Sequence, residues 1–229
     1  MTVPVRNLPK SHRPVRSFVR REGRMTAAQK RALAELLPRY GLTVGEGLVD
    51  FSDAFGRRAP VVLEIGFGNG DTLAALAAQN PQNNYLGIEV HRPGVGRLLA
   101  RLEAEGLNNV RVLCADAKET LVQYVPDESL SAVYVLFPDP WPKQRHRKRR
   151  LVQMDFVELL RRKLKPGGRL HLATDWSAYA EQMQEVLVHA PGFAPVEQLH
   201  GQLADQSLRA AVAGFLVAQR YRAATAGVA

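Results

Sequence analysis

The sequence predicts an α/β fold built on a mostly parallel central sheet with helices on both faces. Five apolar runs follow Pro60, and helical stretches separate them. The runs are nearly continuous in apolar residues, which is typical of strands buried on both faces. Strands that alternate with helices favour parallel pairing, because each helix carries the chain back across the sheet. Parallel sheets bind ligands at the carboxyl ends of their strands, so the residues that follow each strand are the candidates for chemistry.

The elements can be placed in order along the chain. A short helix is predicted over 26–37, with Thr26 as its N-cap and with Pro38 and Gly41 as its stop. The residues before it are basic and lack periodicity. The strands that follow are predicted at 61–67 (VVLEIGF), 84–90 (NYLGIEV), 110–116 (VRVLCAD), 130–137 (LSAVYVLF) and 169–175 (RLHLATD).

The clearest later helix is predicted over 151–164, where apolar residues recur on one face and the sequence KPGG supplies the stop. The segment GFLVAQRY, at 214–221, is expected to form a last, antiparallel strand. Two units result. Residues 1–45 form a basic N-terminal arm with a short helix, and residues 46–229 form the α/β domain.

Composition excludes several classes of protein. The chain has 229 residues, of which 46% are hydrophobic and 23% charged, as in folded globular proteins. Its apolar runs reach about eight residues, far short of the ~20 of a membrane helix, and no signal peptide is evident. Cys114 is the only cysteine, which excludes a disulfide framework and favours a cytoplasmic setting. His91 and His146 have no ligand-spaced partners, so no metal is expected.

Positive charge is gathered into two blocks. The net charge is +9, residues 1–31 carry nine Lys or Arg against one Glu, and residues 143–150 carry six more. Basic residues gathered in this way indicate a polyanionic partner, since they concentrate positive potential on one surface. A single block is equally typical of a solvated surface. Two blocks beside an enzyme-like core favour nucleic acid.

The first strand runs into the glycine-rich sequence EIGFGNGD. Gly66, Gly68 and Gly70 allow a tight turn and a close approach of the backbone to a ligand. The spacing G-x-G-x-G differs from the dinucleotide fingerprint G-x-G-x-x-G. Glu64 also places negative charge where a pyrophosphate would lie. The pattern favours a ligand with a cationic amine or sulfonium over NAD, with a purely structural turn as the alternative.

Two further carboxylates end the next two strands. Glu89 is placed to accept hydrogen bonds from both hydroxyls of a ribose, and Asp116 is placed near an adenine edge. Each also has an ordinary structural interpretation, as a strand-end residue or a helix N-cap. Together with Glu64 they outline a site for an adenosine-containing ligand.

The fourth strand runs into FPDPWPKQRHRKRR, residues 137–150. Three prolines stiffen the backbone around Asp139 and lower the entropy cost of holding its carboxylate in place. Trp141 could stack on a base or be a buried structural residue. The basic run beyond it could contact a phosphate backbone.

These motifs together resemble a known family. EIGFGNGD, GIEV, CADA, FPDPWPKQRH and ATDW, in this order, are similar to the tRNA (guanine-N7)-methyltransferases, and RSFVRREGRMT resembles that family's N-terminal arm. The resemblance implies a Rossmann-like class I methyltransferase fold, S-adenosylmethionine as cofactor and tRNA as partner. It implies donor-binding roles for Glu64, Gly66, Gly68, Gly70, Glu89, Asp116 and Asp139, a catalytic role for Asp139, substrate contacts for Lys143 and Asp175, and RNA contacts for Arg145, His146, Arg147, Lys148, Arg149 and Arg150.

The C-terminal tail departs from the family. The family's Thr-x-x-Glu element is missing from LRAAVAGFLVAQRYRAATAGVA, because the tail has diverged or its reading frame has changed. The altered tail leaves open an RNA-binding protein without turnover. Methylation of an exocyclic amine is a second alternative to guanine-N7 methylation, because DPW partly resembles the Asp/Asn-Pro-Pro-aromatic motif of amino-methyltransferases. The oligomeric state also stays open between monomer and homodimer.

Overall fold

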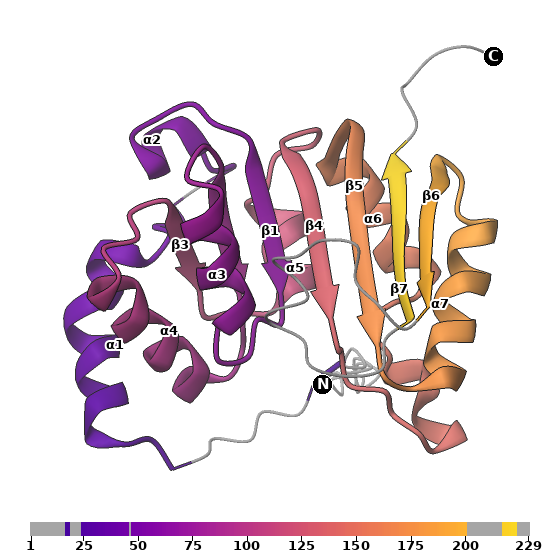
Figure 1. Ribbon diagram of the computed structural model, residues 1–229, viewed down its shortest axis with the longest axis horizontal. Helices are drawn as coiled ribbons and strands as arrows, with labels where there is room; N and C mark the ends of the chain where they lie inside the picture. The colour runs from indigo at the N-terminus through magenta and orange to yellow at the C-terminus, as the bar shows by residue number, and fades with distance from the viewer. Residues whose placement is uncertain (1–16, 19–23, 46, 201–216, 224–229) are drawn as a thin grey trace, which may run out of the picture.

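The computed structural model describes residues 17–18, 24–45, 47–200 and 217–223 (Figure 1). Within these residues seven strands form one sheet in the order β3-β2-β1-β4-β5-β7-β6. All neighbouring pairs are parallel except those of β7, which runs antiparallel to β5 and β6. The strands are β1 (Val61–Ile65), β2 (Asn84–Ile88), β3 (Val110–Leu113), β4 (Leu130–Leu136), β5 (Leu164–Thr174), β6 (Phe193–His200) and β7 (Val217–Ala223).

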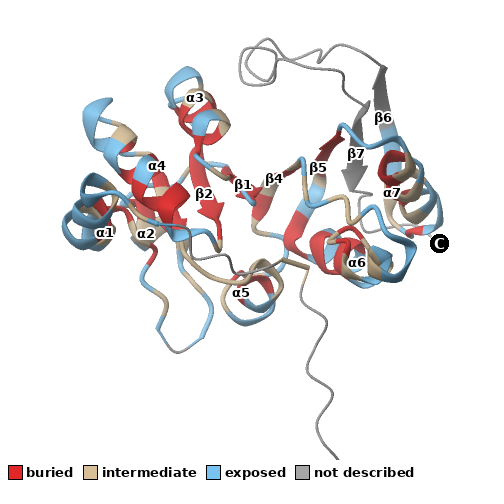
Figure 2. Ribbon diagram, turned by 90° about the horizontal axis from the view of Figure 1, so that it is seen from below, coloured by how far each residue is buried: buried red, intermediate tan, exposed pale blue. Residues whose placement is uncertain are grey.

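Helices cover both faces of this sheet (Figure 2). Three of them, α1, α3 and α4, pack on one face, while α5, α6 and α7 pack on the other. Their bounds are α1 (Ala27–Tyr40), α2 (Phe51–Phe55), α3 (Asp71–Gln79), α4 (Arg92–Ala104), α5 (Ala117–Gln123), the 3-10 helix η1 (Gln144–Arg149), α6 (Met154–Lys163) and α7 (Ser177–His189).

The core lies in two layers, one on each side of the sheet. Along β1, Leu63 and Ile65 point into the layer under α5, α6 and α7, whereas Val62 points into the layer under α1, α3 and α4. All five residues of β1 and of β2 are buried. The prediction of a mostly parallel sheet buried on both faces is therefore confirmed.

Helix α1 begins where the sequence predicted and ends later. Thr26 forms a capping box with Gln29, whose side chain accepts a hydrogen bond from the Thr26 amide. Pro38 lies inside the helix, which runs to Tyr40 and is capped by Gly41. The predicted stop at Pro38 was wrong, because a proline in the last turn breaks only one hydrogen bond and tertiary contacts keep the remaining residues helical. The hydroxyl of Tyr40 donates to Glu103 of α4 at 2.9 Å.

The α1 segment belongs to the packed body of the molecule. A Cβ on Gly96 of α4 would lie 2.7 Å from the carbonyl oxygen of Gln29, so this glycine permits the close approach of α1 to α4. After the helix, the amide of Leu42 donates to the carbonyl of Val112 in β3 at 2.9 Å. The domain boundary was predicted at residue 45. Residues 27–45, which come just before it, pack on the sheet domain.

Two later predictions also shift. The helix predicted over 151–164 begins at Met154, since the amide and carbonyl of Val152 bond to side chains of α7 instead of entering a helix. Strand β5 begins at Leu164 and passes through the sequence KPGG. The last strand is confirmed as antiparallel over Val217–Tyr221, while 201–216, 224–229 and the missing Thr-x-x-Glu element lie outside the described residues.

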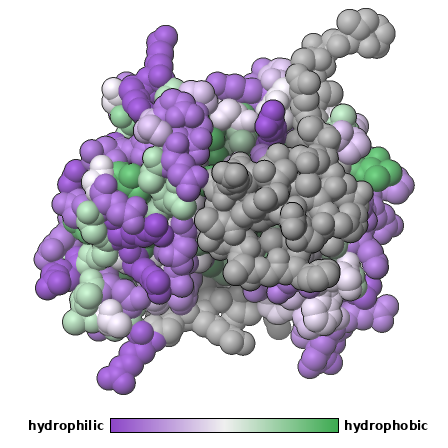
Figure 3. Space-filling model, in the orientation of Figure 1, coloured by the Kyte–Doolittle hydropathy of each residue, from purple (hydrophilic) through white to green (hydrophobic). Residues whose placement is uncertain are grey.

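The surface in Figure 3 is mostly hydrophilic where α1, α3 and α4 face the viewer. Among the described residues, no helix combines the length and hydropathy needed to cross a membrane. The large hydrophobic side chains that are exposed among the described residues are Leu48, Val122, Phe137, Trp176 and Val188. Phe137 and Trp176 follow β4 and β5, which are neighbours in the sheet.

Candidate functional site

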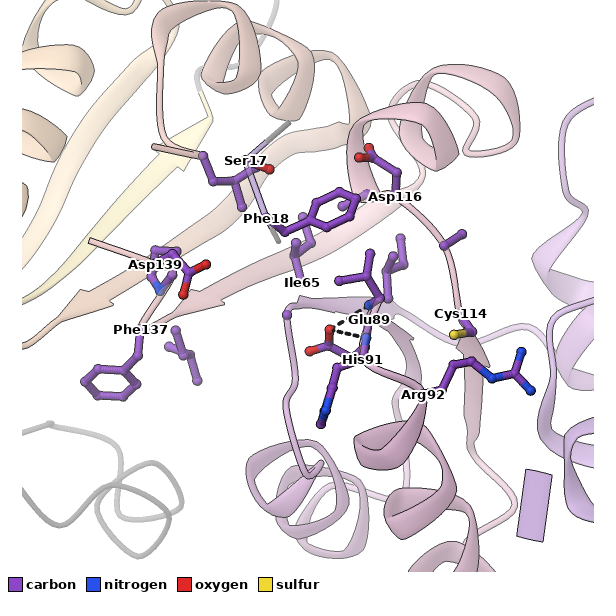
Figure 4. A pocket seen from close by; sticks show the side chains of 18 of the residues that line it. Ser17, Phe18, Ile65, Glu89, His91, Arg92, Cys114, Asp116, Phe137 and Asp139 are labelled. Atoms are coloured by element: carbon purple, nitrogen blue, oxygen red, sulfur yellow. Dashed lines mark hydrogen bonds between the residues drawn. The ribbon is translucent and has the colours of Figure 1, made fainter. Parts of the chain in front are cut away.

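A cavity of about 1130 Å³ opens at the carboxyl ends of β1 to β4 (Figure 4). This volume exceeds the ~300–1,000 Å³ that a pocket for one small molecule usually has. Four of the predicted donor-site residues line it, namely Gly66, Glu89, Asp116 and Asp139. The sheet therefore brings together residues that lie more than seventy positions apart in the sequence.

The glycine-rich turn after β1 needs its glycines for conformation. Gly66, Gly68 and Gly70 have φ of 73°, 58° and 80°, in the left-handed region where side chains are strained. Gly70 is the residue before α3, and a Cβ there would lie 2.6 Å from Leu98 of α4. Gly66 lines the cavity, whereas Gly68 and Gly70 are not among the described residues that line it.

Glu89 is fixed by the main chain at the end of β2. Its carboxylate accepts hydrogen bonds from the amides of Gly68 (2.9 Å), Val90 (2.6 Å) and His91 (2.8 Å). Only 9% of the residue is exposed, yet it lines the cavity. These amides hold one orientation of the carboxylate and tie the glycine-rich turn to β2, as the dashed lines of Figure 4 show in part.

Glu64 is buried inside strand β1. It is 3% exposed, and its Oε2 has no hydrogen-bond partner among the described residues. Burial, followed by repulsion from Glu89, raises the pKa of Glu64 to about 8. Glu64 is not among the described residues that line the cavity, and with a pKa of about 8 it is protonated at neutral pH.

Asp116 caps a helix and also lines the cavity. It is the N-cap of α5, because its carboxylate accepts a hydrogen bond from the Glu119 amide at 3.1 Å. It also lines the cavity and remains partly exposed. Capping therefore orients a side chain that can still bind a ligand.

The loop after β4 holds Asp139 in an unusual backbone conformation. Phe137 and Trp141, on either side of it, have φ of 52° and 43°, and such strain costs ~1–3 kcal/mol per residue. The amide of Phe137 donates to the carbonyl of Ala173 in β5 at 2.8 Å. Asp139 is exposed, and Figure 4 shows it across the cavity from Asp116.

Trp141 is held from several sides. Its indole N–H donates to the carbonyl of Ser17 at 3.1 Å, the guanidinium of Arg149 lies 4.2 Å from its ring centre, and His146 meets it edge-on. These contacts favour the structural interpretation of Trp141 over free stacking on a base. The described residues Ser17 and Phe18 also line the cavity, a contribution that periodicity could not have revealed.

The basic block forms the 3-10 helix η1. The exposed cations of this segment are Arg145, Arg147 and Lys148 on η1 and Lys143 at its N-cap. Partial burial, together with the positive charges of Arg145, Arg149 and Lys143, lowers the pKa of His146. The block offers a row of cations directly after the Asp139 loop.

Arg150 differs from the rest of the block. It is 2% exposed, and its guanidinium donates to the carbonyls of Pro140 and Ala178 and to the side chain of Gln182. The prediction that Arg150 contacts RNA is therefore wrong, because a guanidinium enclosed by its own chain cannot reach a phosphate.

Lys143 lies in the loop that follows β4, and Asp175 directly follows β5. Both are exposed, and neither is among the described residues that line the cavity. The described residues also contain no group of three or more His, Cys, Asp or Glu side chains arranged to hold a metal ion.

Comparison with known proteins places the chain in a family. Residues 58–213 match a family described as "Putative methyltransferase". The chain is 58% identical over 181 residues to a protein named tRNA (guanine-N(7)-)-methyltransferase from Nitrosococcus oceani, covering 79% of this chain and 77% of that one. A protein of the same name from Alkalilimnicola ehrlichii is 60% identical over 182 residues, covering 78% and 76%. The chain belongs to the tRNA (guanine-N(7)-)-methyltransferase family.

Solved structures agree on the fold of this family member. The 16S rRNA methyltransferase KamB superposes with a TM-score of 0.56 at 16% identity, covering 82% of this chain and 99% of that one. A 16S rRNA (adenine(1408)-N(1))-methyltransferase from Catenulisporales acidiphilia, solved with its cosubstrate SAM, gives 0.53 at 18% identity, covering 83% and 97%. These similarities confirm the Rossmann-like class I methyltransferase fold.

Proposed function

We propose that the protein transfers the methyl group of S-adenosylmethionine to nitrogen 7 of a guanine in tRNA. The observation that carries the proposal is one cavity where Glu89, Asp116 and Asp139 meet, in a chain 58–60% identical to proteins of that name. The exposed cations of η1 lie directly after the loop that holds Asp139.

The residues present fit S-adenosylmethionine. Glu89 offers a fixed carboxylate to the two ribose hydroxyls, and Asp116 offers one to the adenine edge. Gly66 lets the donor's methionine end approach the backbone. The carboxylate of Glu89 supplies negative charge, which a ligand with ammonium and sulfonium charges would neutralise. Such a ligand would also favour the ionised form of Glu64, which burial and Glu89 keep protonated at neutral pH.

When bound, S-adenosylmethionine supplies a methyl group on an electron-poor sulfonium, and its transfer is an in-line displacement in which positioning dominates. Nitrogen 7 of guanine offers a lone pair without losing a proton, so Asp139 need not be a general base. Asp139 accepts hydrogen bonds from the guanine edge or the donor and stabilises the positive charge that develops on the purine.

We assign the residues of the acceptor side from their exposure and charge. Lys143 and Asp175 contact the substrate, while Arg145, Arg147 and Lys148 contact phosphates of the tRNA backbone. His146 and Arg149, which pack on Trp141, shape the surface between the two. Phe137 and Trp176 are 39% and 43% exposed on neighbouring strand ends, where they offer flat surfaces on which a purine can stack.

The test is incubation of the protein with labelled S-adenosylmethionine and unmodified tRNA, followed by nucleoside analysis. We expect 7-methylguanosine. The matched control is the same tRNA transcribed with 7-deazaguanosine, which lacks the accepting nitrogen and should take no label. Recovery of a methylated exocyclic amine, or donor binding without any transfer, would overturn the proposal.

A further inference from the structure

The segment that carries the basic block is attached to α7 at its C-terminal end. Arg150, the last residue of the block, donates through Nε to the carbonyl of Pro140 at 2.8 Å, and through Nη1 to Ala178 (3.0 Å) and Gln182 (2.6 Å) of α7. The guanidinium also lies 4.7 Å from the ring centre of Tyr179. One buried side chain thus joins the carbonyl next to Asp139 to a helix on the far side of the segment.

Two residues further along the chain, Val152 is held by the same helix. Its amide donates to the hydroxyl of Tyr179 at 3.0 Å, and its carbonyl accepts from Nε2 of Gln182 at 3.2 Å. Gln182 therefore bonds both to Arg150 and to Val152. Arg150, Tyr179 and Gln182 are called the α7 clamp below.

The composition of the Asp139 loop explains why it needs such a clamp. Pro138, Pro140 and Pro142 have no N–H, so the loop can bond to the protein mainly through its carbonyls. A strained backbone persists only where its surroundings hold it, and Phe137 and Trp141 both have positive φ. The guanidinium of Arg150, which donates to the carbonyl of Pro140, is therefore well placed to keep this backbone conformation.

The chemistry of Arg150 suits positioning better than simple stabilisation. Its Nη2 is buried and has no hydrogen-bond partner among the described residues, which is unfavourable for an enclosed charged group. A planar guanidinium can reach three acceptors in fixed directions, as it does here, whereas a lysine ammonium cannot reproduce that fork. An apolar side chain could fill the same volume but could not bond to Pro140.

From this geometry we propose that the α7 clamp positions Asp139 for methyl transfer, and that Arg150 is a positioning residue and not part of the RNA-binding surface. The proposal rests on the proposed function, since it assumes that Asp139 acts on the acceptor base. It predicts that loss of the clamp lowers kcat while tRNA binding stays intact.

The experiment compares Arg150→Met and Gln182→Ala with Arg145→Met, which removes an exposed cation of the same block. Steady-state kinetics with unmodified tRNA give kcat and KM, and hydrogen exchange reports on the amides of 143–153. We expect Arg150→Met to lower kcat by roughly 10- to 100-fold and Gln182→Ala by roughly 3- to 10-fold, each with KM for tRNA within about twofold. Arg145→Met should show the opposite pattern, a raised KM with kcat retained.

Hydrogen exchange separates this proposal from the proposed function. Faster exchange of the Val152 amide in Gln182→Ala, with unchanged exchange in the central strands, would support the clamp even if the unaltered protein formed no 7-methylguanosine. Should Arg150→Met fail to fold, Gln182→Ala decides, because Gln182 is only half-buried. A raised KM in place of a lowered kcat, an unchanged kcat in a protein that forms 7-methylguanosine, or unchanged exchange at Val152 in Gln182→Ala would overturn the proposal.

Discussion

The two sides of the cavity hold their carboxylates in opposite ways. On the donor side, Glu64 and Glu89 are 3% and 9% exposed, and three main-chain amides bond to Glu89. On the acceptor side, Asp139 is exposed and is held in place by the backbone of its own loop. The donor side is part of the core, whereas the acceptor side is a stiff projection from it.

This difference separates stability from activity. A buried residue that bonds to the main chain cannot be changed without affecting folding, since the amides it satisfies are left unpaired. An exposed residue on a loop can be changed at little cost to stability. Changes on the donor side should therefore alter stability together with donor affinity, and changes on the acceptor side should alter turnover or tRNA binding alone.

The largest expected effect concerns Glu64 and pH. Its pKa is about 8 in the folded protein, because of burial and Glu89, against its usual value of 4.5. Between these values the folded state binds one more proton than the unfolded state, so stability falls as pH rises, by roughly 3 kcal/mol from pH 5 to 8. Glu64→Gln has no charge to bury and should flatten this dependence.

Urea unfolding of both proteins at pH 5, 6.5 and 8, without donor, measures the effect of Glu64. Titrating groups that do not interact with Glu64 contribute equally to the two curves, so their difference reports on Glu64 and its neighbour Glu89. Parallel curves would mean that Glu64 is already ionised at neutral pH, and that the donor side is less sealed than its burial indicates.

Asp139→Asn should have the next largest effect. It keeps the shape of the side chain and removes its charge, so turnover should fall by ~10²-fold while donor affinity changes less. Because Asp139 is exposed, the free energy of unfolding should change by less than about 0.5 kcal/mol. Single-turnover assays and denaturation measure the two quantities. Intact turnover with weakened donor binding would make Asp139 a donor-binding residue instead.

Glu89→Ala should weaken binding of S-adenosylmethionine by ~1–3 kcal/mol, because the ribose hydroxyls lose a charged acceptor. Unlike the Asp139 change, it should also lower the stability of the protein, since the amides of Gly68, Val90 and His91 lose their hydrogen-bond acceptor. Calorimetry and thermal unfolding on the same samples test the coupling. Unchanged affinity with lowered stability would reduce Glu89 to a residue that shapes the turn.

The smallest effect is expected from the exposed cations of η1. Arg145, Arg147 and Lys148 are chosen because Arg149 packs on Trp141 and Arg150 is buried. Their joint replacement by alanine should weaken tRNA binding by roughly tenfold at 0.15 M salt and flatten the slope of log affinity against log salt by two to three units. Donor affinity should stay constant. An unchanged slope would mean that this surface does not contact phosphate.

Much of this molecule could be predicted without coordinates, for reasons that are local. The strands were identified because apolar runs of strand length depend only on neighbouring residues, and Thr26 was identified as a cap because a capping box spans three positions. The positions of Glu89 and Asp116 after two successive strands were enough to place both at one edge of the sheet, whereas Glu64 lies inside β1 and is not among the described residues that line the cavity. Parallel strands with intervening helices always bring their carboxyl ends together.

Other features depended on contacts that no local pattern contains. Pro38 looked like a helix stop, but the bond between Tyr40 and Glu103, 63 positions away, lies in the turn that continues beyond it. The shift of α6 to Met154 likewise depends on Tyr179 and Gln182. Such bonds form only once distant helices pack.

Arg150 shows most clearly what could not be predicted from the sequence alone. In the sequence it is one of six cations between 143 and 150, and nothing nearby distinguishes it from Arg147 or Arg149. In the fold it is buried against α7, whose partner residues lie 28 and 32 positions further along the chain. Charge and spacing could predict that a basic block exists, because these are properties of the chain itself. Which cation faces solvent and which bonds to the Pro140 carbonyl is a property of three-dimensional packing, since burial is set by the elements that close over a side chain.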